Sequence, residues 1–194
     1  DIYEHVWDVQ INQLGLPAPP LTHTNGKYEI YVCDLMDISD GIVGRTVTTY
    51  EYQNPYYAES FIEIDNDYAG YNFGGITLEE FNQVLAAHEF FHSIQFGMNY
   101  YSPSTWLMEI GAVWMEDKIY PDVNDYLYFV ATYRAPRSYV PIDTDPGNRT
   151  AYGFPQTGVN NEYGAAIFLR YITERVTGDD FVIDLWENLK QSCL

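Results

Sequence analysis

The amino-acid sequence predicts a protein of the α+β class, in which a small sheet precedes a set of helices. Stretches rich in β-branched and aromatic residues gather in the first third of the chain. Helical patterns dominate the rest, beginning with a long and strongly apolar one. Because the strand candidates come before the first long helix and do not alternate with helices, we expect a mixed or antiparallel sheet. The predicted strands are residues 28–33, 45–52 and 60–65.

The length and charge of the chain restrict its class. At 194 residues it fits one domain, which we divide into residues 1–97, with the sheet and the long helix, and a mainly helical part, residues 98–194. The 9 lysines and arginines face 28 aspartates and glutamates, and the net charge of −19 argues against binding to nucleic acid or an anionic membrane. No apolar run is long enough to span a bilayer, and no signal-peptide pattern opens the sequence. We therefore expect a secreted, monomeric protein, of which this sequence is the mature or an excised segment.

The N-terminal part is expected to contain an arm, the sheet and a polar turn. Residues 1–26 are rich in proline and glycine, which predicts an extended arm with a short element at residues 6–14. Several side-chain oxygens near turns are candidate calcium ligands, and turn or capping roles are their alternative. These candidates are Asp65, Asn66 and Asp67, the pair Asp122 and Asp125, and the pair Asp143 and Asp145.

Helices should follow the sheet. The first should begin at Thr77, because Thr77 and Glu80 have the spacing of a capping box, and should end at Gly97. Apolar residues occupy most of its circumference, so we expect it to be buried. The stretch 134–158 is rich in proline and glycine and predicts a long loop that covers one side of a cleft, with an ordinary packed irregular stretch as the alternative. A second helix should begin near residue 102 or 104 and end before residue 121, and the other predicted helices are residues 122–132, 161–176 and 179–190.

The long helix carries an HExxH pattern formed by His88, Glu89 and His92. Histidines four positions apart lie on one face of a helix, so the two imidazoles can bind one metal ion. The composition of the chain predicts the pattern by chance only about 0.005 times. A catalytic zinc needs a third protein ligand and an open position; Glu109 in the next helix is the candidate, and Glu116 is its rival. Glu89 is then suited to act as a general base, whereas hydrogen-bonded core histidines are the structural alternative.

Together with the segment around Glu109, this pattern resembles the gluzincin clan of zinc metallopeptidases. Residues 106–112, with the sequence Trp-Leu-Met-Glu-Ile-Gly-Ala, are similar to the segment that carries the glutamate ligand in the aminopeptidase-type branch. The whole chain resembles a poorly characterised group of secreted bacterial metalloproteases. The resemblance implies a zincin-like fold, with a twisted sheet over the HExxH helix and a mainly helical C-terminal subdomain. It also implies that His88, His92 and Glu109 bind zinc and that Glu89 is the base.

The resemblance implies further features outside the motif. Gluzincins place a tyrosine or histidine from a later helix near the developing oxyanion; Tyr163 is the first candidate and Tyr152 the second. An ordinary structural role is the alternative for both, because the chain has 19 tyrosines. The strand at 60–65 is implied to be the edge along which an extended substrate lies. Thermolysin-like members orient a histidine with an aspartate where this chain has Val113. The candidates left for that orienting role are Glu116 and Asp117.

The predicted activity is zinc-dependent hydrolysis of bonds within a peptide or protein substrate. The chain lacks the segment by which the aminopeptidase-type branch holds a free N-terminus, and this favours an endopeptidase. An aminopeptidase of the same clan and a non-catalytic, zinc-containing peptide-binding module are the alternatives.

Two cysteines, Cys33 and Cys193, stand far apart in the sequence. They form no CxxC pattern, so we expect neither a cysteine-ligated zinc site nor a redox motif. They either pair in an oxidising compartment or remain two separate buried thiols.

Overall fold

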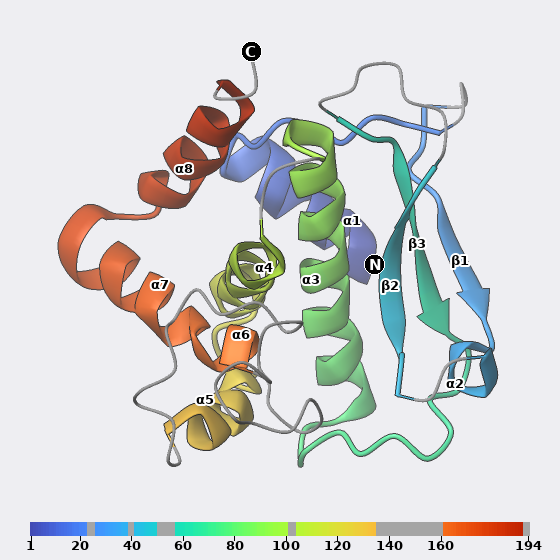
Figure 1. Cartoon of the computed structure of the whole chain (residues 1–194). Helices are drawn as coiled ribbons and strands as arrows, with labels where there is room; N and C mark the ends of the chain where they lie inside the picture. The colour runs from blue at the N-terminus through green and yellow to red at the C-terminus, as the bar shows by residue number, and fades with distance from the viewer. Residues whose placement is uncertain (23–25, 39–40, 50–56, 101–103, 135–160, 192–194) are drawn as a thin grey trace.

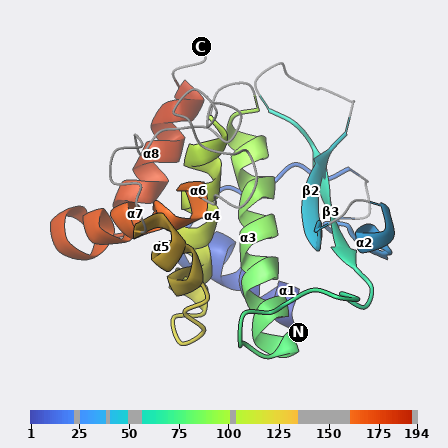
Figure 2. The same cartoon turned by 60° about the horizontal axis from the view of Figure 1, so that its bottom comes forward.

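The computed structural model combines a small mixed sheet with a set of helices, in agreement with the predicted α+β class. The long helix α3, Leu78–Met98, stands between the sheet on one side and the C-terminal helices on the other, as Figure 1 and Figure 2 show. No helix among the described residues is both long and apolar enough to cross a membrane. The residues described are 1–22, 26–38, 41–49, 57–100, 104–134 and 161–191.

The sheet has three strands, β1 (Ile30–Cys33), β2 (Gly44–Thr48) and β3 (Ser60–Asp65), in the order β1-β3-β2. Strand β1 runs parallel to β3, and β2 runs antiparallel to it. The mixed sheet confirms the prediction, and β3 has its predicted bounds. The expectation that residues 60–65 form the edge for substrate is wrong, because β3 is paired on both sides. Among the described strands, β2 is the edge that lies beside α3.

Helix α3 begins where the sequence predicts and ends slightly later. Thr77 is its N-cap, and a complete capping box forms, since Glu80 accepts a hydrogen bond from the backbone amide of Thr77 at 2.7 Å. The predicted cap at Gly97 is wrong, because the helix continues to Met98 and Asn99 is its C-cap. Gly97 instead permits close packing: a Cβ atom there would lie 2.6 Å from Cδ of Pro20.

The N-terminal segment is helical, which corrects the predicted extended arm. Helix α1, Ile2–Trp7, is capped by the Asp1 side chain and continues into the π-helical turn η1, Asp8–Gln13. Buried Gln10 donates a hydrogen bond from its amide to the carbonyl oxygen of Ala87 at 3.0 Å and so fastens this segment to α3. The first proline of the chain is residue 17, which lies after η1. The prolines therefore do not interrupt the helical segment.

The helices after α3 follow the predicted order with altered bounds. The helix predicted to begin near residue 102 or 104 is observed as α4, and the one predicted at 122–132 begins four residues later. The predicted helix 161–176 is divided into short helical pieces, whereas the last helix is close to its predicted bounds. The loop predicted at 134–158 lies almost entirely outside the described residues, as does Cys193, the proposed partner of Cys33. The remaining elements are α2 (Leu35–Ile38), α4 (Thr105–Ile119), α5 (Tyr126–Arg134), α6 (Asn161–Gly164), α7 (Ala166–Ile172), η3 (Thr173–Thr177) and α8 (Asp180–Gln191).

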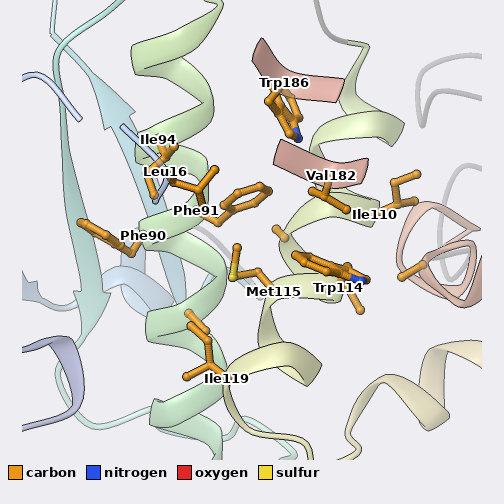
Figure 3. Close-up of a cluster of buried hydrophobic side chains, with 14 of the residues drawn as sticks. Leu16, Phe90, Phe91, Ile94, Ile110, Trp114, Met115, Ile119, Val182 and Trp186 are labelled. Carbon is orange, nitrogen blue, oxygen red and sulfur yellow. The ribbon is translucent and has the colours of Figure 1, made fainter. Parts of the chain in front are cut away.

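The main hydrophobic core surrounds α3 on two sides. Figure 3 shows Phe90 directed toward the sheet and Phe91 directed toward α4 and α8, where Met115 and Trp186 lie. Helices α3 and α4 approach closely at Gly111, where a Cβ atom would lie 3.0 Å from the Phe91 ring. A helix that is apolar around its circumference is expected to be buried, and α3 confirms this. The packing fixes α3 and α4 relative to each other, and these two helices carry the predicted ligands.

Candidate metal centre

The two histidines of the HExxH pattern and Glu109 lie together between α3 and α4. Nε2 of His88 and Nε2 of His92 are 3.0 Å apart. The Glu109 carboxylate faces both: Oε2 lies 3.2 Å from Nε2 of His88, and Oε1 lies 3.6 Å from Nε2 of His92. The three side chains can each offer one ligand atom so that these atoms all lie within 4.8 Å of one another. Among the histidine, cysteine, aspartate and glutamate side chains in the described part of the chain, these three form a group that could hold a metal ion.

The opposite nitrogen of each imidazole contacts a second side chain. Nδ1 of His92 lies 2.7 Å from Oε1 of Gln95, whose amide nitrogen donates to the carbonyl oxygen of Met108 at 3.0 Å. The Gln95 oxygen is therefore left to accept the Nδ1 proton of His92. Nδ1 of His88 contacts Oε1 of Glu116 in the same way. With both protons on Nδ1, both Nε2 atoms present lone pairs toward Glu109.

This arrangement calls for a positive charge between the three side chains. Two imidazole lone pairs and a carboxylate repel one another at these distances unless a cation or added protons separate them. Oε2 of Glu109 is buried and makes no contact with hydrogen-bond geometry, and a bound metal ion would coordinate this oxygen. The residues thus fit a divalent metal with two nitrogen ligands and one oxygen ligand.

The pKa values of these groups report the same need for positive charge. Burial alone lowers the pKa of His88, but its close contacts with the Glu109 and Glu116 carboxylates outweigh burial and raise the pKa well above the usual value. Burial alone raises the pKa of Glu109, yet the neighbouring His92 and His88 hold it below its ordinary range. Without a metal the site therefore gathers protons, and a metal ion would displace them.

Of the two candidates for orienting a ligating histidine, Glu116 and Asp117, Glu116 is the one that contacts His88. It lies on the Nδ1 side of His88, away from the three ligand atoms, so it does not replace Glu109 in the group. Burial, and then the charge of Asp125, raises the pKa of Glu116 to about 7. Asp117 faces the other way, where its carboxylate accepts a hydrogen bond from Arg170 at 2.9 Å. The spacing of Glu116 seven residues after Glu109 favours Glu116 over Asp117 for this role, because it puts Glu116 and Glu109 on one side of α4.

Glu89 is buried on the sheet side of the metal cluster and is held by a residue that the motif does not predict. The hydroxyl of Thr46 in β2 lies 2.8 Å from Oε2 of Glu89 and 2.7 Å from the Glu89 carbonyl oxygen. Ser93 donates to the same carbonyl at 3.2 Å. Thr46 is 43 residues from Glu89 in sequence. No local pattern could indicate this contact, because it depends on the pairing of β2 with the rest of the sheet.

A cavity of about 390 Å³ opens beside His88 and Glu89. The predicted oxyanion residue Tyr163 lines it, and its ring stacks on the His88 ring with centroids 6.0 Å apart. The Phe129 ring also stacks on the Tyr163 ring, with centroids 5.0 Å apart. The second candidate, Tyr152, lies outside the described residues. The cavity therefore joins Glu89 and Tyr163 to one ligand of the cluster.

The acidic turn after β3 has a structural role. Oδ2 of Asp65 accepts hydrogen bonds from the amides of Leu35 and Met36 at 2.8 Å, and Oδ1 accepts from those of Asp67 and Tyr68. Burial alone raises the pKa of Asp65, but these four amides outweigh it and lower the pKa. A carboxylate satisfied by four amides is a turn anchor, so the calcium prediction finds no support here. The pair Asp143 and Asp145 lies outside the described residues.

No family model matches the chain, and neither a curated protein nor a solved structure matches it. The resemblance to gluzincins consequently stays a prediction from the motif. Any function for this chain has to be inferred from the chemistry of the cluster and of the cavity beside it.

Proposed function

We propose that this protein is a zinc-dependent endopeptidase of the gluzincin type with a zincin-like fold. The observation that carries the proposal is the convergence of two imidazole nitrogens and a carboxylate, with the additional acid Glu89 in the cavity that one of these ligands, His88, also lines. A structural zinc site normally closes all four positions with protein ligands and has no use for such an acid. The arrangement therefore favours catalysis over a non-catalytic peptide-binding module.

Zinc is the metal that best suits this set of ligands. Two imidazoles and one carboxylate are the ligands of many hydrolytic zinc sites, which keep a further position open. When bound, a zinc ion would lower the pKa of a water molecule and polarise the carbonyl group of the substrate. His88, His92 and Glu109 would hold the ion, and Glu116 and Gln95 would orient the two imidazoles.

The roles of the other residues follow from their positions. Glu89 accepts the proton of the attacking water and passes it to the departing amine. The Thr46 hydroxyl fixes the Glu89 carboxylate by a hydrogen bond of 2.8 Å. Tyr163, whose ring lies against His88, donates a hydrogen bond to the oxyanion that develops on the substrate carbonyl.

An extended peptide that continues on both sides of the cut bond fits this site better than a peptide held by its free N-terminus. Strand β2 is an edge of the described sheet, and residues that precede and begin it line the cavity with Glu89. A substrate can add to such an edge through backbone hydrogen bonds and continue on both sides of the scissile bond. This supports an endopeptidase over an aminopeptidase. The same proposal makes the protein secreted and monomeric, with a peptide or protein as its substrate.

Hydrolysis of unfolded casein by the purified protein, with and without a metal chelator, tests the proposed function. Casein should be cleaved only by the metal-loaded protein. Glu89→Gln should keep the metal and lose most activity, while Glu79→Gln, at an exposed position of the same helix, should behave as the wild type. Cleavage that survives the chelator or Glu89→Gln would contradict the mechanism. Metal analysis of each protein shows whether the substitution has spared the site.

A further inference from the structure

The cavity beside the metal cluster extends to an acidic end formed by Asp125. Asp125 lines both this cavity and an adjoining one of about 320 Å³. The two cavities also share Tyr71, Phe81 and Phe129 as walls. Cavities of about 300–1,000 Å³ are typical of ligand sites. The space that begins at His88 and Glu89 is therefore large enough to receive a substrate side chain.

Asp125 differs from the other carboxylates of this cavity in its partners. Glu116 contacts His88, and Glu89 is held by Thr46. The half-buried carboxylate of Asp125 accepts a hydrogen bond from the amide of Tyr126, at the start of α5. No lysine or arginine in the described ranges lines either cavity. Asp125 thus faces a cavity whose described walls contain no lysine or arginine, and the described side chain whose positive charge acts on it is His88 of the cluster.

The walls near Asp125 are aromatic. The rings of Tyr71 and Phe81 have centroids 5.0 Å apart, and Phe73 packs on Phe81 at the same distance. Apolar rings suit the methylene stem of a lysine or arginine side chain, and their faces attract its cationic end. A carboxylate at the end of an aromatic wall therefore matches a long basic side chain better than an acidic or short polar one.

We propose that this cavity, through Asp125 and its aromatic walls, selects substrates with lysine or arginine next to the scissile bond. The inference rests on the proposed peptidase function and names the side chain that the site accepts. The net charge of −19 favours basic substrates in general but does not favour any position in the cleft; Asp125 supplies such a position.

Asp125→Asn is the variant that tests this role. Asparagine caps a helix about as well as aspartate, so the hydrogen bond to α5 can persist while the charge is lost. Asp122→Asn, at an exposed position in the same turn, is the matched control. A cleavage profile on a peptide library should show lysine or arginine at one position flanking the cut bond. For a matched pair of peptides, Asp125→Asn should lower kcat/KM for the lysine peptide roughly 10- to 100-fold and leave that for the norleucine peptide nearly unchanged.

A binding measurement separates this inference from the proposed function. Butylguanidinium, an analogue of the arginine side chain, should bind to the metal-loaded Glu89→Gln protein and bind roughly 10- to 100-fold more weakly when Asp125→Asn is added. A wild-type profile without basic preference, a preference that Asp125→Asn leaves intact, or an absence of butylguanidinium binding would overturn the inference. If no peptide is cleaved but butylguanidinium still requires Asp125, the cation site is supported and the proposed peptidase function is overturned.

Discussion

Glu116→Gln should weaken metal binding without removing any ligand. The Glu116 carboxylate contacts Nδ1 of His88, and both side chains are buried. A metal on Nε2 would lie about 6 Å from that carboxylate, where two unit charges interact by about 3 kcal/mol at an effective dielectric constant of 20. Glutamine keeps the size of the side chain and an oxygen that can accept the Nδ1 proton, so only part of this interaction is lost. We expect zinc affinity to fall roughly 10- to 100-fold, as for other outer partners of ligating histidines.

Competition with a coloured zinc chelator measures this affinity directly. Glu79→Gln removes one carboxylate from an exposed position of α3 and serves as the control for the change in net charge. It should alter the affinity by less than about twofold, because exposed charges at a distance are screened. Equal affinities for Glu116→Gln and the wild type would refute the orienting role of Glu116.

Four other perturbations have definite expected outcomes. Thr46→Val should lower kcat roughly 10- to 100-fold, because the catalytic carboxylate loses its fixed position, whereas Thr46→Ser should retain most activity; equal rates for both variants would exclude the role of the hydroxyl. Tyr163→Phe should lower turnover roughly 10- to 1,000-fold with zinc still bound, as metal analysis can verify, and unchanged turnover would remove Tyr163 from the mechanism. The raised pKa values of Glu116, about 7 against an ordinary 4.5, and of His88 mean that the folded apo protein binds more protons than the unfolded chain, so its stability should fall as the pH rises from about 5 to above 7. Thermal unfolding in chelator measures this slope, which should be smaller for Glu116→Gln; an equal slope would contradict the assignment. Gly97→Ala should destabilise the fold by about 1–3 kcal/mol in urea, because the new Cβ would meet a proline ring at 2.6 Å, and an unchanged unfolding midpoint would disprove that close packing.

The features that the sequence predicts well depend on local patterns. The capping box of Thr77 and Glu80 locates the start of α3, and a short stretch rich in β-branched and aromatic residues locates β3. The HExxH spacing implies that His88 and His92 share one face of a helix, and the structure brings them to 3.0 Å. Each of these depends on residues that are at most five positions apart.

The features that sequence reasoning missed depend on contacts between distant segments. Strand β3 is central because it pairs with both β1 and β2. The residue pattern of a strand does not specify which other strands it pairs with. Gly97 resembles a helix cap, but it serves the approach of Pro20, which lies far away in sequence. The helix at the N-terminus is stabilised by burial of Val6 and Gln10 against α3, and this tertiary packing outweighs the weak local signal.

The candidate site divides along the same line. Its three proposed ligands were expected, because a metal requires donors in a recognisable spacing. Glu116 was one of two alternatives, and the structure distinguishes it from Asp117 by their different partners. Thr46 and Asp125 had no assigned place in the site, since only the folded chain brings β2 and α5 to the cavity.

Anomalous diffraction at the zinc absorption edge, from crystals grown with zinc, tests the central claim most directly. One strong peak should lie about 2.0–2.1 Å from Nε2 of His88 and of His92, and about 2.0–2.2 Å from a carboxylate oxygen of Glu109. A cleft without an anomalous peak, or a peak bound through Glu116 in place of Glu109, would contradict the metal centre described above.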